Sequence, residues 1–159
     1  MSTPTFFELL ESDMKIELGS HTFGAEEIIL FATKFDPQPF HLSDEGARNS
    51  HFGKLCASGW HTASIWMRKN MDNGIDEMIR MTGYEGPAPV LGPSPGIKNI
   101  RWQHPVFVGD TIRYSSTLTT KKRHPKRSEW GRVMNQSHGV NQDGKLVFSM
   151  DGSVTMRVD

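Results

Sequence analysis

The chain has 159 residues, and its 18 basic and 18 acidic side chains leave no formal net charge at pH 7. This length is typical of one domain, so we expect a single domain over residues 1–159. The balanced charge gives no reason to expect a nucleic-acid or membrane partner. The N-terminus lacks a leader pattern, no apolar run of roughly eighteen residues is present, and one cysteine allows no internal disulfide. We therefore expect a cytoplasmic protein.

The first half of the chain predicts three helices. A short helix over Ala25–Ala32 has Gly24 as its candidate N-cap and two glutamates in its first turn. A second short helix is predicted over 43–48, and a longer one opens within Cys56–His61. The longer helix has apolar residues near helical spacing, which predict its buried face: Trp60, Ala63, Met67 and Met71.

The second half, from Ile97 onward, predicts strands. Ile112, Tyr114 and Leu118 share one parity, which is typical of a strand with one buried face. A second alternating set closes the chain: Leu146, Phe148, Met150, Val154 and Met156. Turns at 121–127 and 141–144 join the last strands. The pattern predicts an antiparallel meander on the long helix, and therefore an α+β fold.

Two tryptophans and a loop segment also have predicted positions in the fold. Trp102 and Trp130 are expected to pack within the sheet. The segment 83–96 is rich in Gly and Pro, which predicts a loop. That loop is either a passive connector or a wall of the substrate pocket.

The segment Asp36-Pro37-Gln38-Pro39-Phe40-His41 places a carboxylate and an imidazole five residues apart, with two prolines between them. Each proline fixes its own φ and favours extended geometry at the residue before it, which predicts a rigid, non-helical mount. Histidine titrates near neutrality and a carboxylate can orient its ring, so the pair suits general acid/base work on a bound water. An ordinary proline-rich turn also accounts for the segment taken alone.

Other reactive residues in the sequence also have structural interpretations. Cys56, with His41 or His61, is a candidate thiol nucleophile, but its apolar neighbours favour a small buried side chain. The seven histidines lack the paired spacing that zinc sites use, so no metal is predicted. His61 either lines a pocket or packs and caps its helix. The basic run 121–127 fits a solvated hairpin end.

Three motifs together resemble the MaoC-like dehydratases, a family that includes the (R)-specific enoyl-CoA hydratases. The first motif matches an Asp-x-Asn-Pro-apolar-His pattern with a following acid at Asp36, Pro39, Phe40, His41 and Asp44. The second is the Pro-Val-x-x-Gly-Asp turn at 105–110, and the third is Ser58-Gly59, where the family usually has His-Gly. The resemblance extends from about Ile16 to Val158. Gln38, in place of Asn, and Ser58, in place of His, depart from the family pattern.

The resemblance implies the hotdog fold, an antiparallel sheet wrapped around a long central helix, and (R)-specific hydration of trans-2-enoyl-CoA or the reverse dehydration. Asp36 and His41 would hold the water, and the Gly59 amide would be the oxyanion donor, because glycine lacks a Cβ and lets the thioester approach the backbone closely. The substrate-binding residues would be Gln38, Phe40, Ser58, Trp60 and His61. CoA or a carrier-protein pantetheine would be part of the substrate, with no separate cofactor.

The resemblance also implies a homodimer or a higher oligomer of dimers, since pairing of sheet edges satisfies exposed backbone groups. A CoA 3′-phosphate would be attracted to the basic run 121–127. Because Gln38 orients less tightly than Asn and Ser58 replaces His, two alternatives stay open. They are a hotdog acyl-CoA thioesterase and a catalytically silent acyl-CoA-binding protein.

Overall fold

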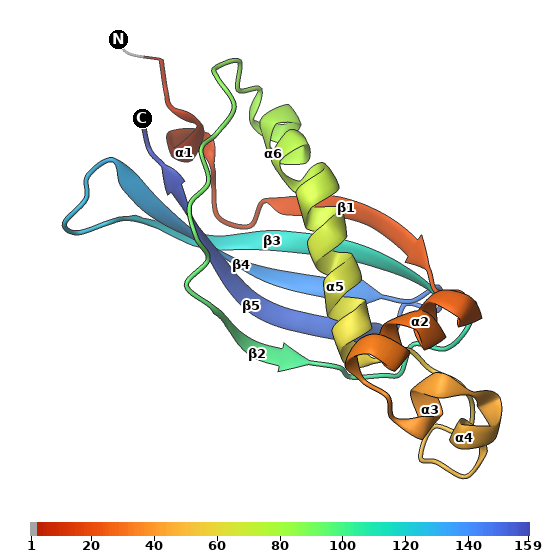
Figure 1. The fold of residues 1–159 in the computed structure, drawn as a ribbon. Coiled ribbons are helices and arrows are strands. Elements are labelled where there is room, and N and C mark those ends of the chain that lie inside the picture. Colours follow the sequence, from red (N-terminus) through yellow and green to blue (C-terminus); the bar gives the residue numbers. More distant parts are fainter. Residues whose placement is uncertain (1–2) are drawn as a thin grey trace.

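The computed structural model describes residues 3–159. A five-stranded antiparallel sheet curves around one long helical segment (Figure 1), which confirms the predicted α+β class. In space the strands follow the order β1-β3-β4-β5-β2. Their bounds are β1 Lys15–Thr22, β2 Ile97–Arg101, β3 Thr111–Arg123, β4 Trp130–Val140 and β5 Leu146–Arg157.

The three longest strands form the predicted meander. β3 pairs with β4 and β4 with β5, and the turn at 141–144 closes with a Gly144 N–H bond to the Asn141 carbonyl at 3.0 Å. The prediction is wrong for β2, which pairs with β5 at the sheet edge instead of with the next strand in the chain. β1, which the periodicity did not reveal, pairs with β3 at the opposite edge.

Burial on β3 and β5 follows the predicted parity with two interruptions, because Ser115 and Val147 are buried on the opposite parity. Ile112, Tyr114 and Leu118 are all buried. On β5, Phe148, Met150 and Met156 are buried as predicted, whereas Leu146 and Val154 are only half-buried. Val147 is buried as well, next to the register shift between Gly139 and Val140, because a bulge changes which face a residue presents.

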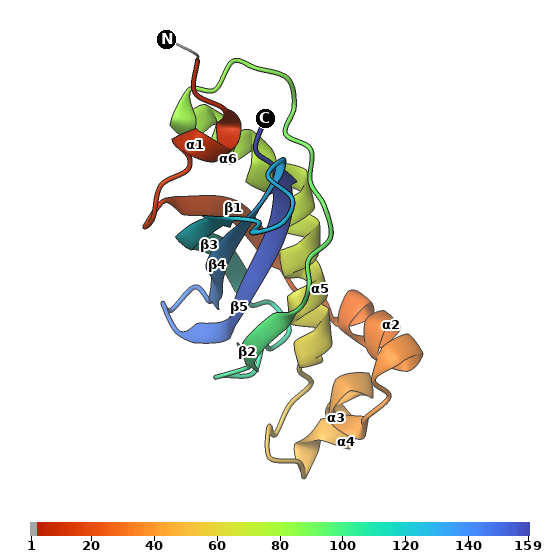
Figure 2. The same ribbon diagram turned by 90° about the vertical axis from the view of Figure 1, so that its left-hand side faces the viewer.

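The central helical segment consists of α5 (Gly59–Lys69), a π-helical turn η1 (Asn70–Gly74) and α6 (Ile75–Thr82). It lies along one face of the sheet (Figure 2). Ser58 caps its N-terminus, and Gly83 ends it in the left-handed region at φ 65°. Glycine adopts that region without the steric cost that a Cβ would bring.

The buried face of α5 differs from the predicted one. Of the predicted residues, Ala63 packs against the core, whereas Trp60, Met67 and Met71 are 55%, 49% and 66% exposed. The residues that α5 buries are His61, Thr62 and Trp66. The Thr62 carbonyl accepts a hydrogen bond from the buried Tyr114 hydroxyl at 2.9 Å. A buried tyrosine hydroxyl requires an acceptor, and the Thr62 carbonyl of α5 is that acceptor.

Four shorter helices precede α5: α1 (Phe6–Leu9), α2 (Ala25–Phe35), α3 (Pro39–Leu42) and α4 (Asp44–Arg48). The last three gather at one end of the sheet (Figure 1). The Gly24 cap is confirmed, because its N–H donates to Glu27 at 2.8 Å. The expectation that 36–41 is entirely non-helical is wrong, because Pro39 occupies the first position of α3, where its missing N–H has no cost.

The loop over 83–96 runs beside β5. The Gly92 N–H donates to the Thr155 carbonyl at 2.8 Å, and Leu91 forms a bridge to Met156. The loop borders a second cavity of about 350 Å³, which lies between the central helical segment and the sheet. Among residues 3–159, no helix is long and apolar enough to cross a membrane.

Candidate active site

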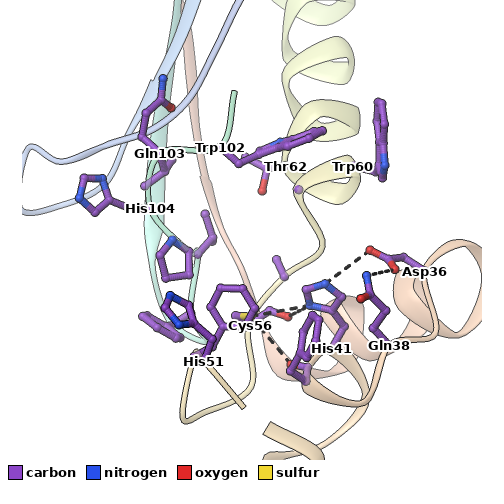
Figure 3. Close-up of a pocket in the computed structure, with 18 residues that line it drawn as sticks. Asp36, Gln38, His41, His51, Cys56, Trp60, Thr62, Trp102, Gln103 and His104 are labelled. Carbon is purple, nitrogen blue, oxygen red and sulfur yellow. Dashed lines mark hydrogen bonds and ion pairs between the residues drawn. The ribbon is translucent and has the colours of Figure 1, made fainter. Parts of the chain in front are cut away.

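A cavity of about 570 Å³ opens where α3, the start of α5 and the segment 102–107 meet (Figure 3). Six of the predicted site residues line it: Asp36, Gln38, Phe40, His41, Gly59 and Trp60. Proline-biased geometry places Asp36 at the C-cap of α2 and His41 inside α3. The short segment between these helices therefore brings the carboxylate and the imidazole to one wall.

Asp36 and His41 face each other across a short gap. The Asp36 Oδ2 atom lies 3.4 Å from His41 Nε2, and the His41 side chain is 7% exposed. His41 Nδ1 lies 2.7 Å from the Cys56 carbonyl oxygen, which can only accept, so Nδ1 carries the hydrogen. In the neutral ring Nε2 is then an acceptor facing a carboxylate. At 3.4 Å, beyond the usual N–H···O range of about 2.7–3.2 Å, the two atoms can share a donor.

Two side chains donate to the Asp36 carboxylate. Gln38 Nε2 donates to Oδ1 at 2.7 Å, and Ser58 Oγ donates to Oδ2 at 2.6 Å. Burial acts to raise the pKa of Asp36, but these hydrogen bonds and the nearby His41 outweigh it and hold that pKa below the ordinary value. Asp36 is therefore an ionised acceptor at neutral pH.

Gly59 is the first residue of α5, and its N–H has no acceptor among the described residues. A Cβ built at Gly59 would lie 2.5 Å from Cε2 of Trp102. The space that the glycine leaves is therefore filled by the indole, whereas the sequence suggested that it admits a thioester. Trp102 was expected in the sheet but lines the cavity, edge-on to Trp60 with 5.0 Å between ring centroids.

Ser58 and His61, both predicted to bind substrate, are not among the residues that line this cavity. Ser58 is fully buried because its hydroxyl is turned toward Asp36. His61 is 5% exposed and stacks on Phe31 at 4.7 Å, with Nε2 3.6 Å from Glu27 Oε2. Burial lowers the pKa of His61. The packing role that the sequence left open for His61 is the observed one.

Cys56 lies beside the candidate pair but is poorly suited to nucleophilic attack. Its Sγ is 3.7 Å from His41 Nδ1, yet that nitrogen already donates to the Cys56 carbonyl. Burial raises the pKa of the thiol to about 11, so the reactive thiolate is scarce at neutral pH. The predicted small buried side chain is confirmed. Within residues 3–159, no cluster of three His, Cys, Asp or Glu side chains is placed to hold a metal ion.

Several lining residues were not predicted, and most come from loops: His51, Phe52, Gln103, His104 and Phe107. The sequence signal near these residues was the turn motif at 105–110, which contains Phe107. The structure confirms this turn. Gly109 has φ 88°, and the Asp110 carboxylate accepts from the Phe107 N–H at 2.9 Å. The basic run 121–127 lies at the other end of the sheet from α3 (Figure 1) and is not part of the cavity lining.

Comparison with known proteins identifies the family. The model of the MaoC like domain matches residues 9–139. A MaoC-like dehydratase from Rhodospirillum rubrum is 31% identical with a TM-score of 0.79, and the alignment covers 94% of both chains. An Archaeoglobus protein described as a monoamine oxidase regulatory protein is 30% identical with a TM-score of 0.77, covering 98% of this chain and 96% of the other.

Two further relatives share less of their sequence with this chain. YdeM of Bacillus subtilis, itself uncharacterised, is 25% identical over 83% of this chain and 84% of its own. An (R)-hydratase of A. caviae involved in PHA biosynthesis is 22% identical with a TM-score of 0.63, covering 91% of this chain and 96% of the other. That likeness concerns the fold, which is the hotdog fold. The chain belongs to the family of MaoC-like dehydratases.

Proposed function

We propose that the protein hydrates trans-2-enoyl thioesters to (R)-3-hydroxyacyl thioesters and catalyses the reverse dehydration. The observation that carries the proposal is the Asp36–His41 pair. Asp36 Oδ2 and His41 Nε2 lie 3.4 Å apart, in the wall of a cavity that Gly59 also lines. The family membership and the likeness to (R)-hydratases support it. CoA or pantetheine is part of the substrate, and the reaction needs no further cofactor.

The shared-acceptor geometry defines how the pair handles water. A water between His41 Nε2 and Asp36 Oδ2 donates one hydrogen to each, which aims its oxygen lone pair at C3 of the enoyl group. His41 accepts one proton as the C3–O bond forms and delivers it to C2, and the other hydrogen stays on the new hydroxyl. Because its pKa is low, Asp36 holds the water while His41 moves the proton.

The thioester oxygen gains negative charge during this addition. The Gly59 N–H is the first amide of α5 and has no acceptor among the described residues. The unsatisfied N–H and the helix dipole both stabilise an anion at that position. Trp102 packs against Gly59 and covers one side of this donor, so the thioester reaches it from the cavity.

A hotdog thioesterase is the second candidate, since the ionised Asp36 carboxylate is also able to direct water at a thioester carbonyl. A silent acyl-CoA-binding protein is the third. We expect the active form to be a homodimer, because β1 and β2 are edge strands whose unpaired backbone groups a second copy can satisfy.

Incubation with crotonyl-CoA and longer enoyl-CoAs separates these functions. Loss of the enoyl absorbance and release of free thiol are followed in parallel, and the configuration of the product is determined by chiral chromatography. Hydration to the (R)-product without thiol release is the expected result. Thiol release identifies a thioesterase, and binding of acyl-CoA without either reaction identifies the silent protein. Both outcomes overturn the proposal.

A further inference from the structure

Ser58 makes two hydrogen bonds in opposite directions. Its Oγ donates to Asp36 Oδ2 at 2.6 Å and accepts from the Trp60 N–H, near the start of α5, at 3.3 Å. The residue is 0% exposed, so water does not compete for these bonds. The hydroxyl therefore connects the end of α2 to the beginning of α5 at the point where both reach the cavity.

We propose that Ser58 is a positioning residue that fixes the Asp36 carboxylate relative to the Gly59 amide. Its catalytic consequence rests on the proposed hydratase function, whereas its effect on Asp36 does not. Ser58 is not among the residues that line the cavity, so it acts through Asp36 and through the helix start. No such role follows from the family pattern, in which histidine usually occupies this position.

The chemistry of the hydroxyl explains why serine suits this position. A hydroxyl donates one hydrogen bond and accepts others, so it serves the carboxylate and the helix amide at once. An alanine would provide neither bond. An aspartate would cap the helix but would place a second negative charge against Asp36, and like charges at that distance repel.

The two donors on Asp36 act on different oxygens. Gln38 holds Oδ1 at 2.7 Å and Ser58 holds Oδ2 at 2.6 Å, which together stop rotation of the carboxylate about its terminal bond. The bond from Ser58 is charge-assisted and short, and such bonds are among the strongest. His41 is the titratable neighbour that acts on Asp36. Loss of the Ser58 hydroxyl leaves Oδ2 facing His41 alone.

The test compares Ser58→Ala with Ser43→Ala. Ser43 caps α4 in the same way, accepting from the Gly46 N–H at 2.9 Å, so both variants lose a helix cap but only one loses a donor to Asp36. The Asp36 pKa is measured by carbon-detected NMR titration of each variant and of Ser58→Thr, which keeps the hydroxyl. We expect the pKa to rise in Ser58→Ala and to stay at the wild-type value in the other two.

Turnover gives the second readout. Misplacing a catalytic group by about 1 Å can cost roughly 10²-fold in rate, so kcat of Ser58→Ala falls by about tenfold or more, whereas KM changes little because Ser58 does not line the cavity. An unchanged Asp36 pKa in Ser58→Ala overturns the inference. A raised pKa in a protein whose wild type does not hydrate enoyl-CoA overturns the proposed function and leaves the inference about Asp36 standing.

Discussion

The cavity at Asp36 and the second cavity, which lies between the central helical segment and the sheet, differ in what holds their walls in place. The cavity at Asp36 is lined largely by short helices and loops, and hydrogen bonds through Ser58, Gln38 and the Cys56 carbonyl fix its reactive groups. The second cavity is lined mainly by the central helical segment and the strands, with aliphatic and methionine side chains. Hydrogen bonds hold the walls of the first cavity in place, whereas apolar side-chain packing holds those of the second.

The polar groups of the two cavities differ in the same way. In the second cavity Asn135 and Ser116 satisfy each other, with Nδ2 to Oγ at 2.5 Å. Both groups are neutral, and the bond stays within the sheet. In the first cavity the carboxylate of Asp36 is ionised and leaves Oδ2 facing His41. Substitutions in the first cavity should therefore change chemistry, and those in the second should change stability.

The largest effect is expected for the pair itself. His41→Ala should lower kcat/KM for hydration by about 10² to 10⁴, the usual range for a general acid or base. Asp36→Ala should lower it comparably, because His41 then acts on a water that is no longer held in place. If both residues hold one water, the double variant should be scarcely worse than the poorer single one. Losses that multiply in folded variants would show that the two residues act independently.

Asp151→Asn is the matched control for this cycle. Asp151 accepts from the side-chain amide of Asn99 at 2.7 Å, as Asp36 does from Gln38, but it is not a lining residue of the cavity. Its substitution should leave hydration near the wild-type rate. Thermal melting of each variant separates lost chemistry from lost folding.

A stability effect without a comparable chemical effect is expected at the second cavity. Leu118 is 5% exposed and lines it, so Leu118→Ala should lower the free energy of unfolding by about 2–3 kcal/mol. This is the lower part of the range for buried leucine, because one side of Leu118 already borders empty space. Leu30→Ala, at a residue 57% exposed, should change it by about 0.5 kcal/mol or less.

Urea denaturation at a fixed protein concentration measures both leucine variants, since association would add to the apparent stability. Equal losses at Leu118 and Leu30 would contradict the packing interpretation. A loss of hydration in folded Leu118→Ala as large as that of Asp36→Ala would remove the contrast between the cavities.

Local signals in the sequence predicted local structure well. The Gly24 cap, the turn at 105–110 and the turn at 141–144 each depend on residues a few positions apart, and all three are confirmed. The Asp36–His41 pairing was predictable for the same reason, because two prolines leave the intervening chain few conformations.

Features that depend on distant contacts were missed. An apolar stripe at Trp60, Met67 and Met71 fits helical spacing, but the side chains that α5 buries are His61, Thr62 and Trp66, and their burial depends on the sheet that packs against them. The acceptor for His41 is a backbone carbonyl, which any residue possesses and no sequence pattern marks. The contact of Trp102 with Gly59 joins segments that are far apart in the chain.

That contact gives a smaller prediction. Gly59→Ala places a Cβ against the Trp102 indole, and such overpacking costs about 1–3 kcal/mol of the free energy of unfolding. In a Trp102→Ala background the same substitution should cost almost nothing, because the clashing ring is gone. Chemical denaturation of the four proteins measures the coupling. The same cost in both backgrounds would mean that the indole does not limit this position.

The smallest effect is expected from the charge of Asp36 on stability. Its folded-state pKa lies below the ordinary value of 3.8, so the ionised carboxylate stabilises the fold fully above that ordinary value. This contribution is lost as the pH falls through the lower folded-state pKa. Because His41 faces Asp36 and histidine titrates between pH 5 and 8, the comparison is made in a His41→Ala background. There the difference in melting temperature between the protein with Asp36 and the Asp36→Asn variant should be constant from pH 7 to about pH 5, and the advantage of the carboxylate should be lost only near and below pH 4. Ser43→Ala, which removes an uncharged cap, should give a difference that does not depend on the Asp36 titration. A difference for Asp36→Asn that already changes between pH 7 and pH 5 would place the pKa of this carboxyl above its ordinary value, and the hydrogen bonds from Ser58 and Gln38 would then not be what sets its charge.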